Sequence, residues 1–75
     1  MANIKDMTYR ELERAMPHSD VEASYSIVEV DGDKFLQIDT YGSQKRQDKG
    51  TVSQSIRFSR ESLKQLAKII ETHFV

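Results

Sequence analysis

The sequence contains no cysteine and only two histidines, His18 and His73. Without thiols the chain can form neither a disulfide framework nor a thiolate zinc site, and the absence of cysteine fits a reducing compartment. Two histidines are too few for a metal cage. The turn chemistry of Asp31 and Asp33 explains these carboxylates better than a calcium loop does. We therefore expect no metal ion and no cofactor.

An excess of one charge and long apolar runs are also missing. The 11 basic residues balance 12 acidic residues for a net charge of -1, which excludes a polybasic protein that binds nucleic acid through bulk charge. No stretch approaches the roughly 18 apolar residues of a membrane span, and the first residues lack the basic start and apolar run of a signal peptide. We expect a soluble, nucleoid-associated protein of the cytoplasm, or of the host-cell cytoplasm if the source is viral.

The length of 75 residues predicts a single domain, residues 1–75, because so short a chain cannot support two cores. Small domains without a disulfide or a metal often gain stability from a second subunit, so we expect a homodimer. The sequence has no glycine-rich phosphate loop, nucleophile elbow or base-paired serine, and it offers little room for a closed pocket. We therefore predict that the protein is not an enzyme.

The first 20 residues are predicted to form an arm that contains one short helix. Thr8 and Glu11 have the spacing of a capping box, and Pro17 stops further helix. Residues 9–16 between them place their apolar side chains on one side. This helix should lean on the rest of the domain, which residues 21–75 build as a sheet and a C-terminal helix.

Two alternating runs, "ASYSIVEV" and "DKFLQIDTY", meet at Asp31-Gly32, the pair that best suits a two-residue turn with positive φ. This turn predicts a register in which Tyr25 lies opposite Ile38. One face of the hairpin then belongs to the core through Tyr25, Ile27, Leu36 and Ile38. The other face carries Val28, Phe35, Gln37, Asp39 and Tyr41.

The segment "TVSQSIRF" resumes the alternation after a polar connection, residues 42–50. It predicts a third strand whose core side consists of Val52, Gln54, Ile56 and Phe58. Ser59 caps a final helix, and apolar residues recur along that helix at helical spacing. The helix has more apolar surface than one small sheet requires, which indicates a partner subunit. The predicted dimer interface consists of Leu66, Ile69, Ile70 and Phe74.

The order of the strand "LQIDTY", a basic connection, the strand "SIRFS" and the helix "RESLKQLAKII" resembles the positive cofactor four family of single-stranded-DNA-binding transcriptional coactivators. The likeness covers residues 25–70 and is strongest in "IRFSRESLKQL". It implies an α+β fold with a small curved antiparallel sheet, backed on one face by the C-terminal helix. It also implies a dimer whose sheet face is crossed by single strands. Tyr41 matches an aromatic position of the family, whereas other family positions are replaced here by Asp31, Asp33, Asp39, Gly42 and Gln54.

The outward face of the sheet is the predicted site for single-stranded DNA. Aromatic rings can stack on any base, while hydroxyls, an amide and a guanidinium can hold the sugar-phosphate chain. Basic residues of the connection would bind further phosphates and release their counterions. The predicted contact residues are Phe35, Gln37, Tyr41, Lys45, Arg46, Lys49, Ser53, Ser55 and Arg57. The alternative is structural: Phe35 and Val28 would pack beneath the N-terminal helix, and Arg57 would only pair with Asp39.

These patterns predict a homodimeric module that binds single-stranded DNA without sequence preference in replication, recombination or transcription. A double-stranded-RNA-binding domain has the same order of a helix, three strands and a helix, but it would need a lysine cluster at the start of the last helix. A protein-protein adaptor or regulatory subunit is the alternative from another class. It would use Phe35, Tyr41 and Ile69 as contact residues, and the net charge of -1 favours it.

Overall fold

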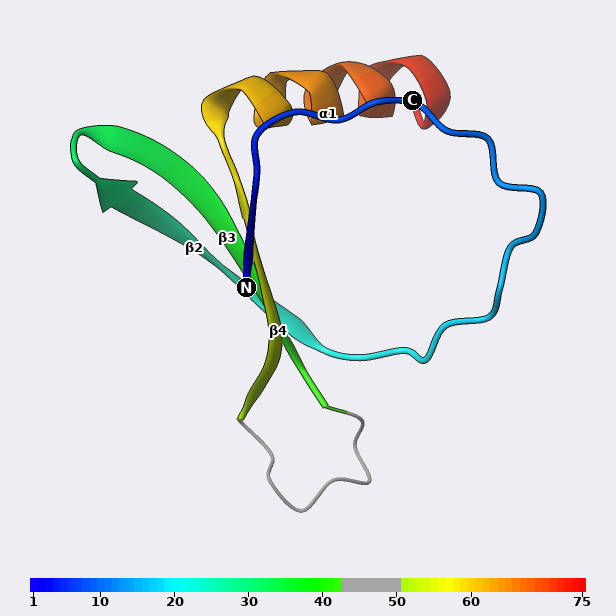
Figure 1. Cartoon of the computed structure of the whole chain (residues 1–75), viewed down its shortest axis with the longest axis horizontal. Helices are drawn as coiled ribbons and strands as arrows, with labels where there is room; N and C mark the ends of the chain where they lie inside the picture. The colour runs from blue at the N-terminus through cyan, green and yellow to red at the C-terminus, as the bar shows by residue number, and fades with distance from the viewer. Residues whose placement is uncertain (43–50) are drawn as a thin grey trace.

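The described part of the protein is a four-stranded sheet with one helix across part of one face (Figure 1). The computed structural model describes residues 1–42 and 51–75. Along the chain the elements are β1 (Ala2–Ile4), β2 (Ala23–Val30), β3 (Asp33–Tyr41), β4 (Val52–Phe58) and α1 (Arg60–His73). The strands lie in the order β1-β4-β3-β2. This arrangement confirms the predicted α+β class and the C-terminal helix.

The hairpin of β2 and β3 has the predicted register. Asp31 and Gly32 both adopt positive φ, 51° and 83°, as a two-residue turn requires. Tyr25 lies opposite Ile38, and the pairing continues without a break along both strands. Because side chains alternate across a strand, this turn decides which residues face α1 and which face away.

The edge of the sheet beside β4 is formed by β1, which runs parallel to β4, with Ala2 opposite Ile56 and Ile4 opposite Phe58. The sheet is therefore mixed, and the prediction of a purely antiparallel sheet was wrong. The free N–H and C=O groups along the outer edge of β4 need partners. The strand β1, from the distant N-terminus, supplies these partners. Three residues are too few to show a periodic pattern, so the sequence did not predict this strand.

The predicted N-terminal helix was also wrong, because the chain from residue 5 to 22 has no regular structure. This segment leaves β1, passes α1 and returns to β2 along a wide path (Figure 1). Tyr9, which the helix should have packed inward, is 86% exposed. A helix of two turns does not offset its nucleation cost without a surface to pack on. A capping box alone is too weak for that purpose.

The register of β4 shifts near its start. Leu36 lies opposite Phe58 and Thr40 opposite Gln54, but Tyr41 lies opposite Val52, so Ser53 has no partner in the ladder. One extra residue inverts the alternation of the side chains beyond it. Val52 is accordingly exposed, and its predicted place in the core was wrong.

The junction between β4 and α1 is held by the predicted cap residue. The Ser59 hydroxyl oxygen accepts a hydrogen bond from the Ser62 N–H at 3.2 Å, and the hydroxyl donates to the Lys5 carbonyl oxygen at 3.1 Å. The Ser59 N–H also donates to the Ile4 carbonyl at 3.2 Å. Ser62 is fully buried here, and its hydroxyl donates to the Ser59 carbonyl at 3.0 Å. One residue therefore ties the helix to the end of β1.

We predict that Ser59→Ala destabilises the fold, because it removes both the cap and the bond to Lys5. The cap alone contributes about 1 kcal/mol, which corresponds to a fall in melting temperature of about 4–8 °C in a domain of this size. Thermal unfolding followed by circular dichroism measures the change. Ser59→Thr keeps the hydroxyl and should melt within about 2 °C of the unsubstituted protein. Equal melting of the alanine variant would show that the junction is held by other contacts.

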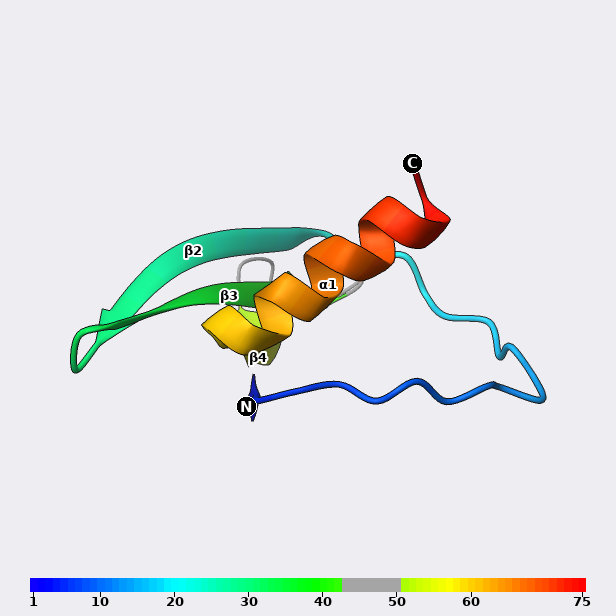
Figure 2. The same cartoon turned by 90° about the horizontal axis from the view of Figure 1, so that it is seen from above.

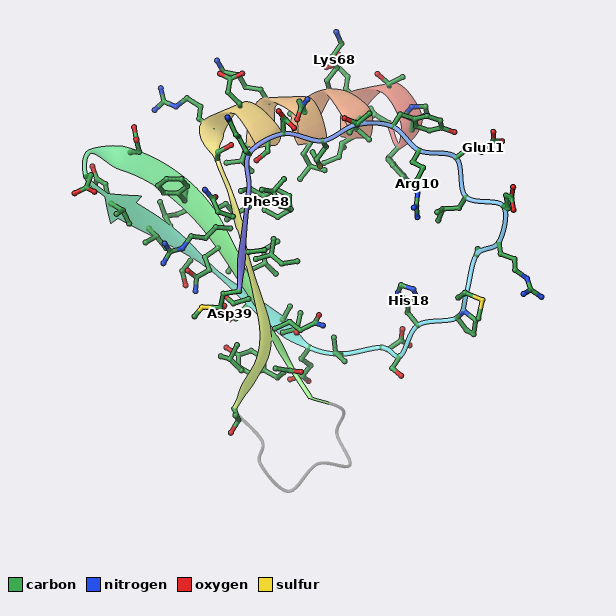
Figure 3. The ribbon with its side chains drawn as sticks, viewed as in Figure 1. Arg10, Glu11, His18, Asp39, Phe58 and Lys68 are labelled. Atoms are coloured by element: carbon green, nitrogen blue, oxygen red, sulfur yellow. The ribbon has the colours of Figure 1, made fainter. Side chains whose placement is uncertain are left out.

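The sheet has two unequal faces. The helix-side face, beneath and beside α1, carries Ile4, Tyr25, Ile27, Leu36, Ile38, Ile56 and Phe58, whereas the opposite face, here called the open face, carries Ser24, Ser26, Phe35, Gln37, Asp39, Tyr41, Ser55 and Arg57. Figure 3 shows Phe58 and Asp39 extending to opposite sides of the sheet. The helix packs on β3 and β4 and leaves β2 uncovered (Figure 2). No helix within residues 1–42 and 51–75 is long and apolar enough to span a membrane.

Candidate nucleic-acid interface

The open face collects most of the predicted contact residues. Phe35, Gln37 and Tyr41 come from β3, and Ser55 and Arg57 come from the neighbouring β4. All five are partly buried, and no described element crosses them. Ser53 is the unpaired residue at the register shift. The three basic residues of the connection, Lys45, Arg46 and Lys49, lie outside the described residues.

A row of hydrogen bonds crosses this face from β4 to β3 and back. Gln37 lies opposite Arg57, and Asp39 lies opposite Ser55. Arg57 Nε donates to Gln37 Oε1 at 2.7 Å, and Gln37 Nε2 donates to Asp39 Oδ1 at 3.0 Å. The Ser55 hydroxyl donates to the same Asp39 oxygen at 2.6 Å. Each polar group thus holds the next, which restricts the rotamers of all four side chains.

Arg57 is held through its Nε and not through an ion pair. The amide of Gln37 lies between the guanidinium and Asp39, so the alternative in which Arg57 pairs directly with that carboxylate does not occur. The two terminal guanidinium nitrogens make no hydrogen bond with the described side chains. Those nitrogens can therefore donate to an incoming group, and the fork geometry suits a phosphate.

An aromatic ring stands near each end of β3. Tyr41 is positioned by its hydroxyl, 2.7 Å from the Ser24 hydroxyl on β2, and by its N–H, which donates to the Glu22 carbonyl at 3.0 Å. Phe35 lies opposite Val28 near the other end. The N-terminal segment forms no helix over Phe35 among the described residues. Tyr41 follows Phe35 by six positions, which is about 20 Å along a strand.

The charges on the open face nearly cancel. Its middle carries one guanidinium, Arg57, and one carboxylate, Asp39, whose oxygens already accept hydrogen bonds from Gln37 and Ser55. The ion pair found among the described residues, Lys64 with Glu61 at 3.8 Å, lies on the helix. Attraction of a polyanion by this face is therefore local, and stacking and hydrogen bonding must supply most of any affinity.

Sequence reasoning placed Asp39 on this face but not among the contact residues, and it missed Ser24 and Asn3. Asp39 is the centre of the hydrogen-bonded row, Ser24 holds the Tyr41 ring, and Asn3 of β1 lies opposite Arg57 and extends the face by one strand. The hairpin register already placed Ser24 beside Asp39 on the outward side, so Ser24 could have been found. Asn3 had no signal, because its position depends on the pairing of β1 with β4.

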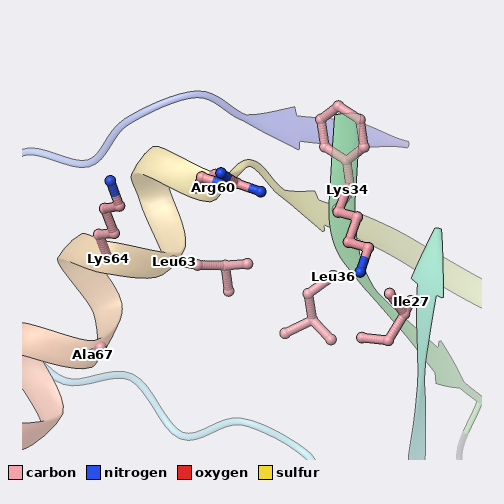
Figure 4. Close-up of a pocket in the computed structure, with 8 residues that line it drawn as sticks. Ile27, Lys34, Leu36, Arg60, Leu63, Lys64 and Ala67 are labelled. Carbon is pink, nitrogen blue, oxygen red and sulfur yellow. The ribbon is translucent and has the colours of Figure 1, made fainter. Parts of the chain in front are cut away.

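A separate groove lies on the helix-side face, between the hairpin and α1. It has a volume of about 410 Å³, and Ile27, Leu36 and Leu63 point into it (Figure 4). Phe35 and Ala67 also line it, together with three cationic residues, Lys34, Arg60 and Lys64. The groove is apolar and open, and it shares no residue of the hydrogen-bonded row.

No protein-family model, curated protein or solved structure matches this chain. The resemblance to the positive cofactor four family accordingly stays a prediction from the sequence. The open face must be interpreted from its own geometry.

Proposed function

We propose that this protein is a small homodimer that binds single-stranded DNA with little sequence preference, in replication, recombination or transcription. The observation that carries the proposal is the open face. It presents Phe35 and Tyr41 at the two ends of β3, a hydrogen-bonded row between them, and no described element above them. A surface of this kind suits an extended strand whose bases are unpaired.

Binding would use the two kinds of group for different parts of the ligand. Bases stack on the rings of Tyr41 and Phe35, which accept any base because every base has a π face. Terminal N–H groups of Arg57 hold a phosphate, and the bond from its Nε to Gln37 fixes the guanidinium in place. Bases within a duplex are already stacked on one another, so a duplex cannot use the rings. This difference favours single strands.

The double-stranded-RNA-binding alternative loses support from the fold. It rests on a helix, three strands and a helix, whereas the described N-terminal segment forms a parallel strand and no helix. The last helix of this protein also begins with Arg60 and Glu61, where that alternative would need a lysine cluster. The adaptor alternative, with Phe35, Tyr41 and Ile69 as contact residues, is tested by the same experiment as the proposal.

Fluorescence-polarisation titration of oligo-dT, duplex DNA and duplex RNA at two salt concentrations tests this function. We expect oligo-dT to bind at least about tenfold more tightly than either duplex, because only its bases can stack on the rings. We also expect a shallow salt dependence from the open face, since one phosphate held by Arg57 gives a slope of about -0.7 per protomer. Preference for duplex RNA would overturn the proposal, and absence of binding to all three would support an adaptor.

A further inference from the structure

The described chain exposes far more surface than a compact protein of its size. Its accessible surface is 7111 Å² and its radius of gyration is 14.6 Å. A compact monomer of 8.7 kDa exposes about 4,700 Å² and has a radius of gyration of about 11 Å. The difference of about 2,400 Å² exceeds the roughly 800 Å² that each partner buries in a standard interface. A second copy could therefore be accommodated with area to spare.

Part of the exposed apolar surface belongs to the extended N-terminal segment, and the rest lies mainly on the hairpin and on the far half of α1. None of the described apolar side chains is buried, and on β2 Tyr25 is 75% and Ile27 66% exposed. The helix contacts the sheet near its beginning and then projects beyond it (Figures 1 and 2). Phe74, at the projecting end, is 77% exposed and stacks edge-on with His73. Within the described chain no strand lies against this half of the helix, and only the N-terminal segment passes it (Figure 1).

Four apolar residues form a seam along the groove side of α1. Leu63, Ala67, Ile70 and Phe74 follow one another at intervals of four, three and four residues, which is the spacing of a coiled-coil seam. The seam is also symmetric about its midpoint. In an antiparallel pair of such helices, Leu63 meets Phe74 of the second copy and Ala67 meets Ile70 of the second copy. Each contact therefore places a small or medium side chain against a larger one, which allows close approach.

The charges beside the seam agree with the same pairing. Lys64 and Glu71 each follow a seam residue, and they lie seven residues, or about two helical turns, apart on the same flank of the seam. An antiparallel partner brings Glu71 of one copy beside Lys64 of the other, twice per dimer. In a parallel pair these positions would instead face Ser59 and Leu66 of the other copy, so neither charge would have an opposite partner. The charges thus select one orientation.

We propose that α1 packs antiparallel against α1 of a second copy of this chain, and that Phe74 of each copy enters the apolar groove of the other. This inference rests on the proposed homodimer and specifies its interface. The groove is lined by Leu63, the residue that antiparallel pairing places opposite Phe74. Of the residues predicted from the sequence, Ile70 and Phe74 lie in this seam. Leu66 follows the buried Ser62 by one turn, and Ile69 lies on the side of Gln65, whose amide bonds to Met7.

Cysteine cross-linking tests the pairing cleanly, because the chain contains no cysteine of its own. Chains carrying Ala67→Cys are mixed with chains carrying Ile70→Cys, refolded together and oxidised, and the covalent dimer is measured on a non-reducing gel. These two positions face each other across the proposed dyad, within disulfide reach. Identical positions are offset by three residues, about 4.5 Å along the axis. We expect at least about fivefold more covalent dimer in the mixture than in either chain alone.

The matched control replaces Ile70→Cys with Lys68→Cys, since Lys68 is not a seam residue and extends from α1 away from the sheet (Figure 3). Sedimentation of the unsubstituted chain and oligo-dT titration accompany the gel. A stable dimer without the selective cross-link would overturn the helix pairing and leave the homodimer intact. A monomer would overturn both, and normal oligo-dT binding by that monomer would preserve the role of the open face.

Charge reversal supplies a second readout that needs no oxidation. Glu71→Lys should raise the dissociation constant of the dimer by about tenfold. It places a second cation beside Lys64 of the other copy, and two-fold symmetry repeats this repulsion at two places in the dimer. Adding Lys64→Glu should restore the constant to within about threefold. Helicity is compared by circular dichroism, since Lys64 also lies 3.8 Å from Glu61 within the helix. Failure of the double variant to recover would contradict the antiparallel orientation.

Discussion

Tyr41→Ala is expected to weaken binding of oligo-dT by about 5- to 150-fold. Removal of one stacking ring costs about 1–3 kcal/mol, and each 1.4 kcal/mol is a factor of ten. The Tyr41 ring is the better placed of the two on the open face, because its hydroxyl bonds to Ser24 and its N–H bonds to the Glu22 carbonyl. A ring held in this way is already oriented before the ligand arrives, so less entropy is lost on binding.

Two control variants separate the ring from its hydrogen bond. Tyr41→Phe keeps the stacking surface and should bind oligo-dT within about threefold of the unsubstituted protein. Ser24→Ala removes the partner of the hydroxyl and should have a similarly small effect. Polarisation titration measures all three variants, and thermal melting reports whether each is folded. If Tyr41→Phe and Tyr41→Ala lost equal affinity for oligo-dT, the hydroxyl and not stacking would be responsible.

Ile70→Glu is expected to raise the dissociation constant of the homodimer by at least about 100-fold. In the proposed seam each copy would bury an unpaired carboxylate, and two-fold symmetry places two of them in one interface. The substitution should leave the isolated chain little changed, because Ile70 is 45% exposed there. Sedimentation equilibrium over a range of concentrations measures the constant.

The neighbouring residue provides the matched control. Ile69 is 40% exposed, almost the same as Ile70, but it lies on the side of the helix that faces the segment around Met7. Ile69→Glu should therefore change the dissociation constant by no more than about threefold. Equal losses from the two substitutions would contradict the seam. The sequence alone placed both residues in the interface, so this comparison also separates the two interpretations.

The candidate site was predictable only as a set of side chains on one face. Phe35, Gln37 and Tyr41 followed from the hairpin register, because a two-residue turn leaves no freedom in the alternation beyond it. Their hydrogen bonds did not follow. The row from Arg57 through Gln37 to Asp39 depends on which residue of β4 lies opposite which residue of β3, and the shift at Ser53 interrupts the pattern that would announce it.

Ser59, Asp31 and Gly32 were identified correctly because their roles depend on residues next to them in the chain. The cap is a contact between positions three apart, and the turn needs only the backbone freedom of two residues. The sequence by itself therefore determined the hairpin, the start of the C-terminal helix and the side of the sheet that each β2 and β3 side chain occupies.

Tertiary structure alone decided what the N-terminal segment becomes. Residues 9–16 have a helical pattern, yet they receive no packing surface, while the three residues of β1 pair with β4 more than 50 positions later. The physical reason is that a short helix needs tertiary support to offset its nucleation cost, whereas the edge of β4 offers a full set of unpaired backbone groups to a strand that can reach it. Such pairing depends on which distant backbone segments meet in the fold, and the local periodicity of the sequence does not predict it.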